Sequence, residues 1–141
     1  MSVEADLGRF VVAQDDGGTF EQALAELRAG RKRTHWMWFV FPQIAGLGSS
    51  AMAKRYAIGS LAEARAYLAH PVLGARLRTA TDAVLGGPAT TAEELLGGID
   101  AQKLRSSMTL FLRAAPQEAR FSAVLERFFD GHADPATDER L

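Results

Sequence analysis

Four polar side chains in the second half of the chain have the types and spacing of a small binding site: Asp100, Lys103, Ser106 and Ser107. In a helix, Asp100, Lys103 and Ser107 share one side, about 100° from the neighbouring apolar stripe. Lysine attracts phosphate or carboxylate, serine donates or accepts hydrogen bonds, and aspartate accepts hydrogen bonds or a proton. We therefore predict that Lys103 and Ser107 bind an anionic ligand, with Asp100 a candidate catalytic proton acceptor. The plainer alternative is that Asp100 caps the helix and Lys103 is its solvated partner.

A second group combines cations with aromatic rings. An aromatic face beside a cation can hold a planar base and a phosphate. Histidine exchanges protons near neutral pH, which makes His35 a second candidate catalytic residue. The alternative is a solvated helix end followed by a buried aromatic anchor, because aromatic runs usually lie in the core. The ligand-binding candidates in this group are Arg31 and Lys32 for charge, Trp36 and Trp38 for stacking, and Gln43 for orientation.

Composition excludes several classes of site. The chain has no cysteine, which removes disulfides, thiolate nucleophiles and zinc–thiolate centres. Its three histidines are too scattered in sequence to suggest a metal site. A net charge of −1 argues against general attraction to nucleic acid. The basic and aromatic residues 31–41 would nevertheless suit a single strand, so nucleic-acid binding stays as a weaker alternative.

Length and hydropathy predict one cytoplasmic domain over all 141 residues. The first six residues lack the apolar core of a secretory signal. The longest apolar run, residues 36–41, is far shorter than the roughly 20 residues that span a membrane. We therefore expect no membrane partner. The acidic segment 132–141 is predicted to be a mobile tail.

The pattern of caps and apolar residues predicts an all-α fold of about seven helices. Capping boxes that begin at Thr19, Ser60 and Thr91 are each followed by apolar residues at helical spacing. No pair of alternating stretches predicts a hairpin. The residues expected in the core are Leu77, Leu104, Met108, Phe111, Leu125 and Phe128.

Residues 34–43 are ambiguous in their secondary structure. As a helix, the run would place His35, Trp38, Phe39 and Pro42 on one side. As a strand, it would place Trp36, Trp38 and Val40 on the same face. Periodicity cannot decide so short a run. We favour a helix because the flanking segments are helical.

Both polar groups fall within a set of stretches that form a recognisable pattern. The stretches are Arg9-Phe10, Ala13-Gln14, Gly30-Arg31-Lys32, the run HWMWF-x-FPQ from His35 to Gln43, Gly46-Leu47-Gly48, Tyr56-Ala57-Ile58, and the run D-x-x-K-L-x-SSMTLF from Asp100 to Phe111. In these stretches the chain resembles a known bacterial family, the "domain of unknown function 1810" family. The resemblance covers nearly the whole chain and implies a compact, mainly helical cytoplasmic domain, with no assigned activity.

The leading hypothesis joins the two polar groups into one pocket for a nucleotide-like or phosphorylated molecule. It requires Lys103 and Ser107 to lie across a cleft from His35, Trp36 or Trp38. The main rival is a non-enzymatic interaction module that presents residues 34–43 as an exposed patch to a protein partner. The sequence identifies no reaction, cofactor or oligomeric state.

Overall fold

A computed structural model describes the backbone of residues 3–141 and the side chains of residues 7–141. The described chain is all-α, with ten α-helices and one 3-10 turn rather than about seven helices. The larger number comes from short helices of four or five residues: α3, α4, α7 and α10. The elements are α1 (Val3–Asp15), η1 (Asp16–Gly18), α2 (Thr19–Ala29), α3 (Met37–Val40), α4 (Ala51–Arg55), α5 (Leu61–Ala69), α6 (Leu73–Gly86), α7 (Ala92–Leu96), α8 (Gly98–Ala114), α9 (Ala119–Phe129) and α10 (Pro135–Asp138).

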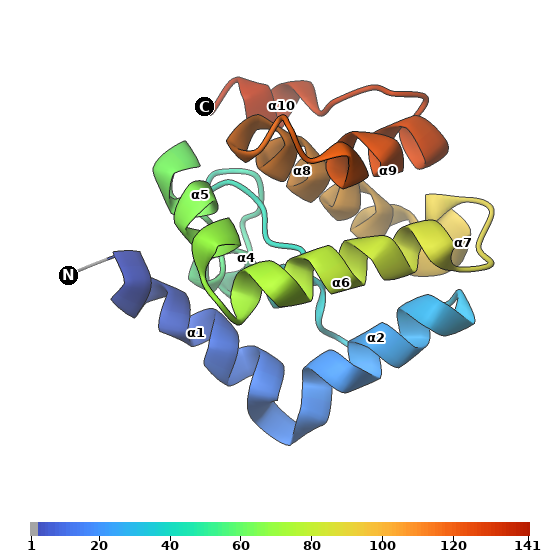
Figure 1. Ribbon diagram of the computed structural model, residues 1–141, viewed down its shortest axis with the longest axis horizontal. Helices are drawn as coiled ribbons and strands as arrows, with labels where there is room; N and C mark the ends of the chain where they lie inside the picture. Colours follow the sequence, from blue (N-terminus) through green and yellow to red (C-terminus); the bar gives the residue numbers. More distant parts are fainter. Residues whose placement is uncertain (1–2) are drawn as a thin grey trace.

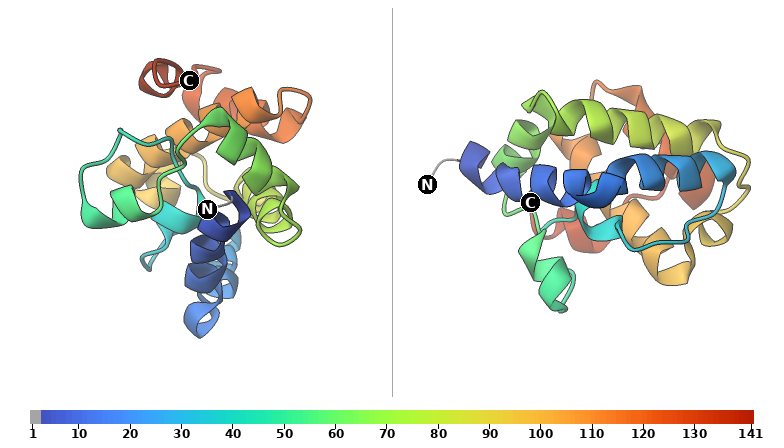
Figure 2. Two further views of the ribbon diagram at one scale, coloured as in Figure 1. Left: turned by 90° about the vertical axis from the view of Figure 1, so that its left-hand side faces the viewer. Right: turned by 90° about the horizontal axis from the view of Figure 1, so that it is seen from below.

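Helix α6 crosses the middle of the fold, as Figure 1 shows. It packs against α2 on one side and against α9 on the other, and α8 packs against both α9 and α5. Helices α1 and α2 form a V, visible in blue in Figure 1. Figure 2 shows the same arrangement of helices from two further directions. Among helices of the described chain, none combines the length and apolarity needed to cross a membrane.

Helix caps explain where several of these elements begin. The hydroxyls of Ser60 and Thr91 accept the backbone N–H groups of Glu63 and Glu94, which confirms two of the predicted caps. The predicted cap at Thr19 is wrong: α2 begins there, but the Thr19 hydroxyl donates to the carbonyl of Asp16. Because η1 leads directly into α2, a carbonyl in the preceding turn is available to that hydroxyl.

The core is built largely around the aromatic run. Trp36 and Phe41 are completely buried and Met37 nearly so. Five of the six predicted core residues are at most 2% exposed: Leu77, Leu104, Met108, Phe111 and Leu125. Phe128 is only half-buried, so its predicted place in the core is wrong; it lies in the last turn of α9, and the Arg127 guanidinium lies 4.8 Å from its ring centre.

Residues 34–43 are neither a full helix nor a strand. A four-residue turn, α3, is the only helical part of this described segment, so the expected helix is right for Met37–Val40 alone. The side-chain amide of Gln14 donates to the Phe39 carbonyl at 2.8 Å. The carbonyl of Gln43 accepts the N–H of Ile58, also at 2.8 Å. Contacts from distant residues therefore determine the path of this segment.

The C-terminal segment makes specific contacts with α8. Arg105 donates to the carbonyls of His132 and Ala133 at 2.9 and 2.8 Å. Asp134 and Thr137 are buried, and the Ser106 hydroxyl donates to the Asp134 carboxylate at 2.8 Å. The mobility predicted for residues 132–141 stays a prediction, and these contacts argue against it.

Candidate functional site

Two lysines from opposite halves of the chain meet at one aspartate. The Lys32 ammonium lies 3.0 Å from one carboxylate oxygen of Asp100, and the Lys103 ammonium lies 3.4 Å from the other. Each ammonium also lies near a tryptophan ring: Lys32 is 5.3 Å from the ring centre of Trp36, and Lys103 is 5.2 Å from that of Trp38. We call these five residues the lysine–tryptophan cluster. It brings the run from His35 to Gln43 and the run from Asp100 to Phe111 together in space.

The five residues of the cluster have a net charge of +1, because two ammonium groups share one carboxylate. Its polar groups are largely shielded, with 10% of the Lys32 side chain exposed and 21% of the Lys103 side chain. Trp36 is fully buried, whereas Trp38 is half-buried. Lys103 and Trp38 are therefore the more exposed lysine–tryptophan pair of the cluster.

The buried carboxylate of Glu26, on α2, holds the chain that precedes the cluster. It accepts hydrogen bonds from the backbone N–H groups of Arg33 and Thr34 at 2.7 and 3.0 Å. It also accepts from the Thr34 hydroxyl at 2.6 Å and from the indole N–H of Trp36 at 3.0 Å. These bonds fold residues 33–36 against α2 and orient Trp36 beneath Lys32.

Hydrogen bonding keeps Glu26 ionised despite its burial. Burial alone raises the pKa of Glu26, but hydrogen bonds from Thr34, Arg33 and Gln22 together lower that pKa from 4.5 to about 2. The carboxylate therefore remains charged throughout the neutral range.

The backbone around Lys32 is fixed from its other side as well. Gly30 ends α2 in the left-handed conformation, at φ 86°, which favours glycine. A side chain at this position would also bring its Cβ within 2.8 Å of Pro88. Two residues later, the N–H of Lys32 donates to the Leu95 carbonyl at 2.7 Å. Gly30 and Leu95 thus direct Lys32 toward Asp100.

Asp100 is not the cap of α8. That helix begins at Gly98, and Gly97 occupies the cap position without a side-chain hydrogen bond. Asp100 lies in the first turn instead, where the helix dipole favours a carboxylate. Its side chain is therefore available to both lysines. The alternative in which Asp100 caps the helix is wrong, whereas its pairing with Lys103 is confirmed.

A cavity of about 550 Å³ adjoins the cluster through Lys32. The end of α2 and the residues that follow it form one wall, including Arg31 and Lys32. The other wall is residues 93–97, at the end of α7. Arg31 and Glu93 are exposed, and their side chains form no ion pair with any described residue.

Three predicted site residues stand apart from the cluster. His35 is exposed, and its side chain makes no hydrogen bond to any residue that the structure describes. Gln43 is half-buried, and its backbone carbonyl accepts a hydrogen bond from the N–H of Ile58. Ser107 is completely buried, and its hydroxyl has no hydrogen-bond partner in the described chain. The binding and catalytic roles of all three stay predictions.

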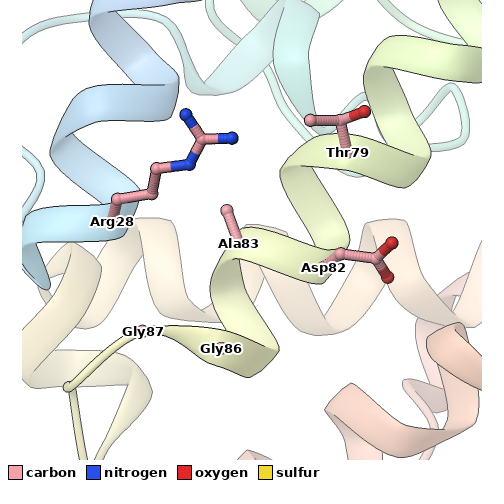
Figure 3. A pocket seen from close by; sticks show the side chains of 6 residues that line it. All are labelled: Arg28, Thr79, Asp82, Ala83, Gly86 and Gly87. Atoms are coloured by element: carbon pink, nitrogen blue, oxygen red, sulfur yellow. The ribbon is translucent and has the colours of Figure 1, made fainter.

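A second hollow lies between α2 and α6, shown in Figure 3, and has a volume of about 400 Å³. Arg28 extends from α2 toward Thr79, and Asp82 lies on the same helix as Thr79. Asp82 is already paired with Arg120 at 3.0 Å. This hollow has no aromatic wall and one unpaired cation, so it is a poorer ligand site than the cluster and its cavity.

No group of three histidine or carboxylate side chains gathers in the part of the chain with described side chains. Sequence reasoning also missed Glu26, the residue that organises the approach to the cluster. The sequence did contain an indication of its burial: Glu26 lies at helical spacing from Ala23 and next to Leu27, on the buried face of α2. A charged residue at such a position requires buried hydrogen-bond partners.

Comparison with known proteins agrees with this fold. Residues 4–141 match the family model described as "Protein of unknown function (DUF1810)". The crystal structure of the conserved hypothetical protein Rv1873 from Mycobacterium tuberculosis is similar, with 50% sequence identity and a TM-score of 0.92. The match covers 96% of each chain. No curated protein was found to match.

Proposed function

We propose that this chain, which belongs to the DUF1810 family, binds a small anionic ligand at the lysine–tryptophan cluster. The observation that carries the proposal is the sharing of Asp100 by two lysines, each beside a tryptophan ring. The arrangement places two ammonium groups on one carboxylate in a partly dehydrated place, where charge attraction is stronger than in water.

Lys103 is the residue that would contact the anion. The Lys103 ammonium lies 3.4 Å from Asp100, farther than the Lys32 ammonium, and the Lys103 side chain is more exposed than that of Lys32. An ammonium group has three donors, so Lys103 can bind a phosphate or carboxylate while it stays near Asp100. Trp38, beneath that ammonium, offers a surface for a planar group. A nucleotide-like or phosphorylated molecule supplies both features.

Binding, rather than a reaction, is the function that this geometry supports. Both carboxylate oxygens of Asp100 are engaged by lysines, which suits the positioning of Lys103 better than proton transfer. His35 has no described partner that would orient its ring. A general base is effective when another group holds it in place.

The two rival functions have less support. An interaction module built on residues 34–43 needs an exposed aromatic patch, but Trp36, Phe39 and Phe41 are at most 6% exposed. Nucleic-acid binding needs an excess of unpaired cations, whereas the net charge is −1. No further observation favours either one.

Titration calorimetry with AMP, ribose 5-phosphate and inorganic phosphate tests the proposal. We expect AMP to bind most tightly, because it combines a phosphate with a planar base. Lys103→Gln should weaken binding at least tenfold, while Lys54→Gln, at the exposed lysine of α4, serves as the matched control. Equal affinities for the two variants would reject the cluster as the site, and no binding of any of the three compounds would reject the proposed function.

A further inference from the structure

The cavity beside the cluster contains charges of both signs, and this restricts the ligand further. We infer that the ligand carries an amine next to its phosphate, and that Glu93 binds the amine. This inference rests on the proposed function and narrows its ligand to a phosphorylated amine. The observation behind it is the pairing of a cationic wall, Arg31 and Lys32, with an acidic wall at the end of α7.

The acidic wall offers one available carboxylate. Glu94 accepts hydrogen bonds from the N–H and hydroxyl of Thr90 at 3.1 and 2.8 Å, so one of its two carboxylate oxygens, Oε2, is engaged within its own turn. Glu93 is exposed, and its carboxylate has no hydrogen bond or ion pair within the described chain. Both glutamates line the same cavity, and Glu93, with neither oxygen engaged, is the better placed to bind a cationic group of a ligand.

The cationic wall is complementary. Arg31 is exposed and has no ion-pair partner among described residues, and Lys32 connects the cavity to Asp100. A phosphate can therefore lie between Arg31 and the cluster while remaining at the cavity's edge. Arginine suits this role because its planar donors match two phosphate oxygens at once.

A ligand with negative charge alone would fit this cavity poorly. It would approach Glu93 as well as Arg31, and like charges at contact distance repel. The C-terminal end of α2 also lines the cavity, and a helix C-terminus favours positive charge. An amine on the ligand turns both effects into attraction. The volume of about 550 Å³ lies in the range of small-molecule sites.

Two probes of nearly equal size separate the contributions of phosphate and amine: O-phosphoethanolamine and ethyl phosphate. Calorimetry at low ionic strength should show at least fivefold tighter binding of O-phosphoethanolamine to the unmodified protein. Glu93→Gln should abolish that preference and leave the affinity for ethyl phosphate unchanged or slightly higher. Glu126→Gln, on α9, makes the same change of net charge at another exposed glutamate and should keep the preference.

The other outcomes distinguish this inference from the proposed function. Equal binding of the two probes to the unmodified protein would overturn the inference and leave the anion site in place. A preference that survives in Glu93→Gln would overturn the role of Glu93. If neither probe binds, the proposed function fails at the level of phosphate recognition, and the inference falls with it.

Discussion

The indole N–H of Trp36 donates a 3.0 Å hydrogen bond to the carboxylate of Glu26, and neither residue is more than 4% exposed. This bond fastens the aromatic run to α2, and the Lys32–Asp100 pair fastens the neighbouring segment to α8. The candidate site therefore depends on a buried carboxylate that a ligand does not touch.

The ionisation of Glu26 should make folding stability depend on pH. Its pKa in the folded protein, about 2, is below the value of 4.5 that it has when exposed. A lowered pKa stabilises the fold above the unfolded value, and the stabilisation disappears as pH falls from about 4.5 to about 2. A shift of this size corresponds to about 3 kcal/mol. Urea unfolding across this pH range measures it.

Two variants separate Glu26 from the other carboxylates. Glu26→Gln should lower the free energy of unfolding at neutral pH by about 3 kcal/mol, and the difference from the unmodified protein should shrink toward pH 2. Glu21→Gln, at an exposed position of the same helix, should leave the pH dependence unchanged. A constant difference at all pH values would show that the ionisation of Glu26 does not contribute to stability.

The two tryptophans should respond differently to replacement by phenylalanine. Trp36→Phe removes a buried indole and leaves the Glu26 carboxylate with one donor fewer, so we expect a loss of about 2–4 kcal/mol. Trp38→Phe should lose less than about 1 kcal/mol, because Trp38 is half-buried. Chemical denaturation of both variants checks this prediction. Similar losses would mean that Trp38 is as much a core residue as Trp36.

Local signals in the sequence were enough to predict much of the fold. The caps at Ser60 and Thr91 and the stripe that contains Leu104 depend on residues three or four positions apart. The sequence was less informative for residues 34–43, where bonds from Gln14 and Ile58 fix the backbone. Spacing within a segment does not reveal such distant partners.

The candidate site was predictable in its residue types but not in its pairings. The sequence and the family resemblance singled out Lys32, Asp100 and Lys103, yet neither indicated that both lysines share one carboxylate. Glu26 was missed because a single glutamate in an amphipathic helix usually faces water. Apart from Gln22, which lies one turn earlier in α2, its donors come from the folded path of residues 33–36.

Adjacent serines on α8 should respond in opposite ways to replacement by alanine. The buried hydroxyl of Ser107 has no hydrogen-bond partner in the described chain, so Ser107→Ala should raise stability by about 1 kcal/mol. Ser106→Ala should lower stability by about 1–2 kcal/mol, because it removes a donor to the buried Asp134. Thermal unfolding measures both. Destabilisation by Ser107→Ala would show that its hydroxyl has a structural partner, such as a bound water.

The last prediction concerns Asp134, which links the C-terminal segment to α8. Burial raises the pKa of Asp134, but hydrogen bonds from Thr137 and Ser106 bring that pKa below its ordinary value. The Asp134 N–H also donates to the Thr109 hydroxyl at 2.9 Å. We therefore expect residues 132–141 to be ordered rather than mobile.

Hydrogen exchange followed by mass spectrometry tests this expectation directly. Amides of α10 and its cap, including that of Glu139, which donates to the Pro135 carbonyl at 3.0 Å, should exchange more slowly than in an unfolded peptide. Asp134→Asn should accelerate their exchange and lower overall stability by about 1–3 kcal/mol, because an amide replaces a charged acceptor. Asp130→Asn, at an exposed carboxylate nearby, is the control for the loss of one negative charge and should leave the exchange of the α10 amides unchanged. Exchange at the unfolded-peptide rate in the unmodified protein would instead confirm the mobile tail that the sequence predicts.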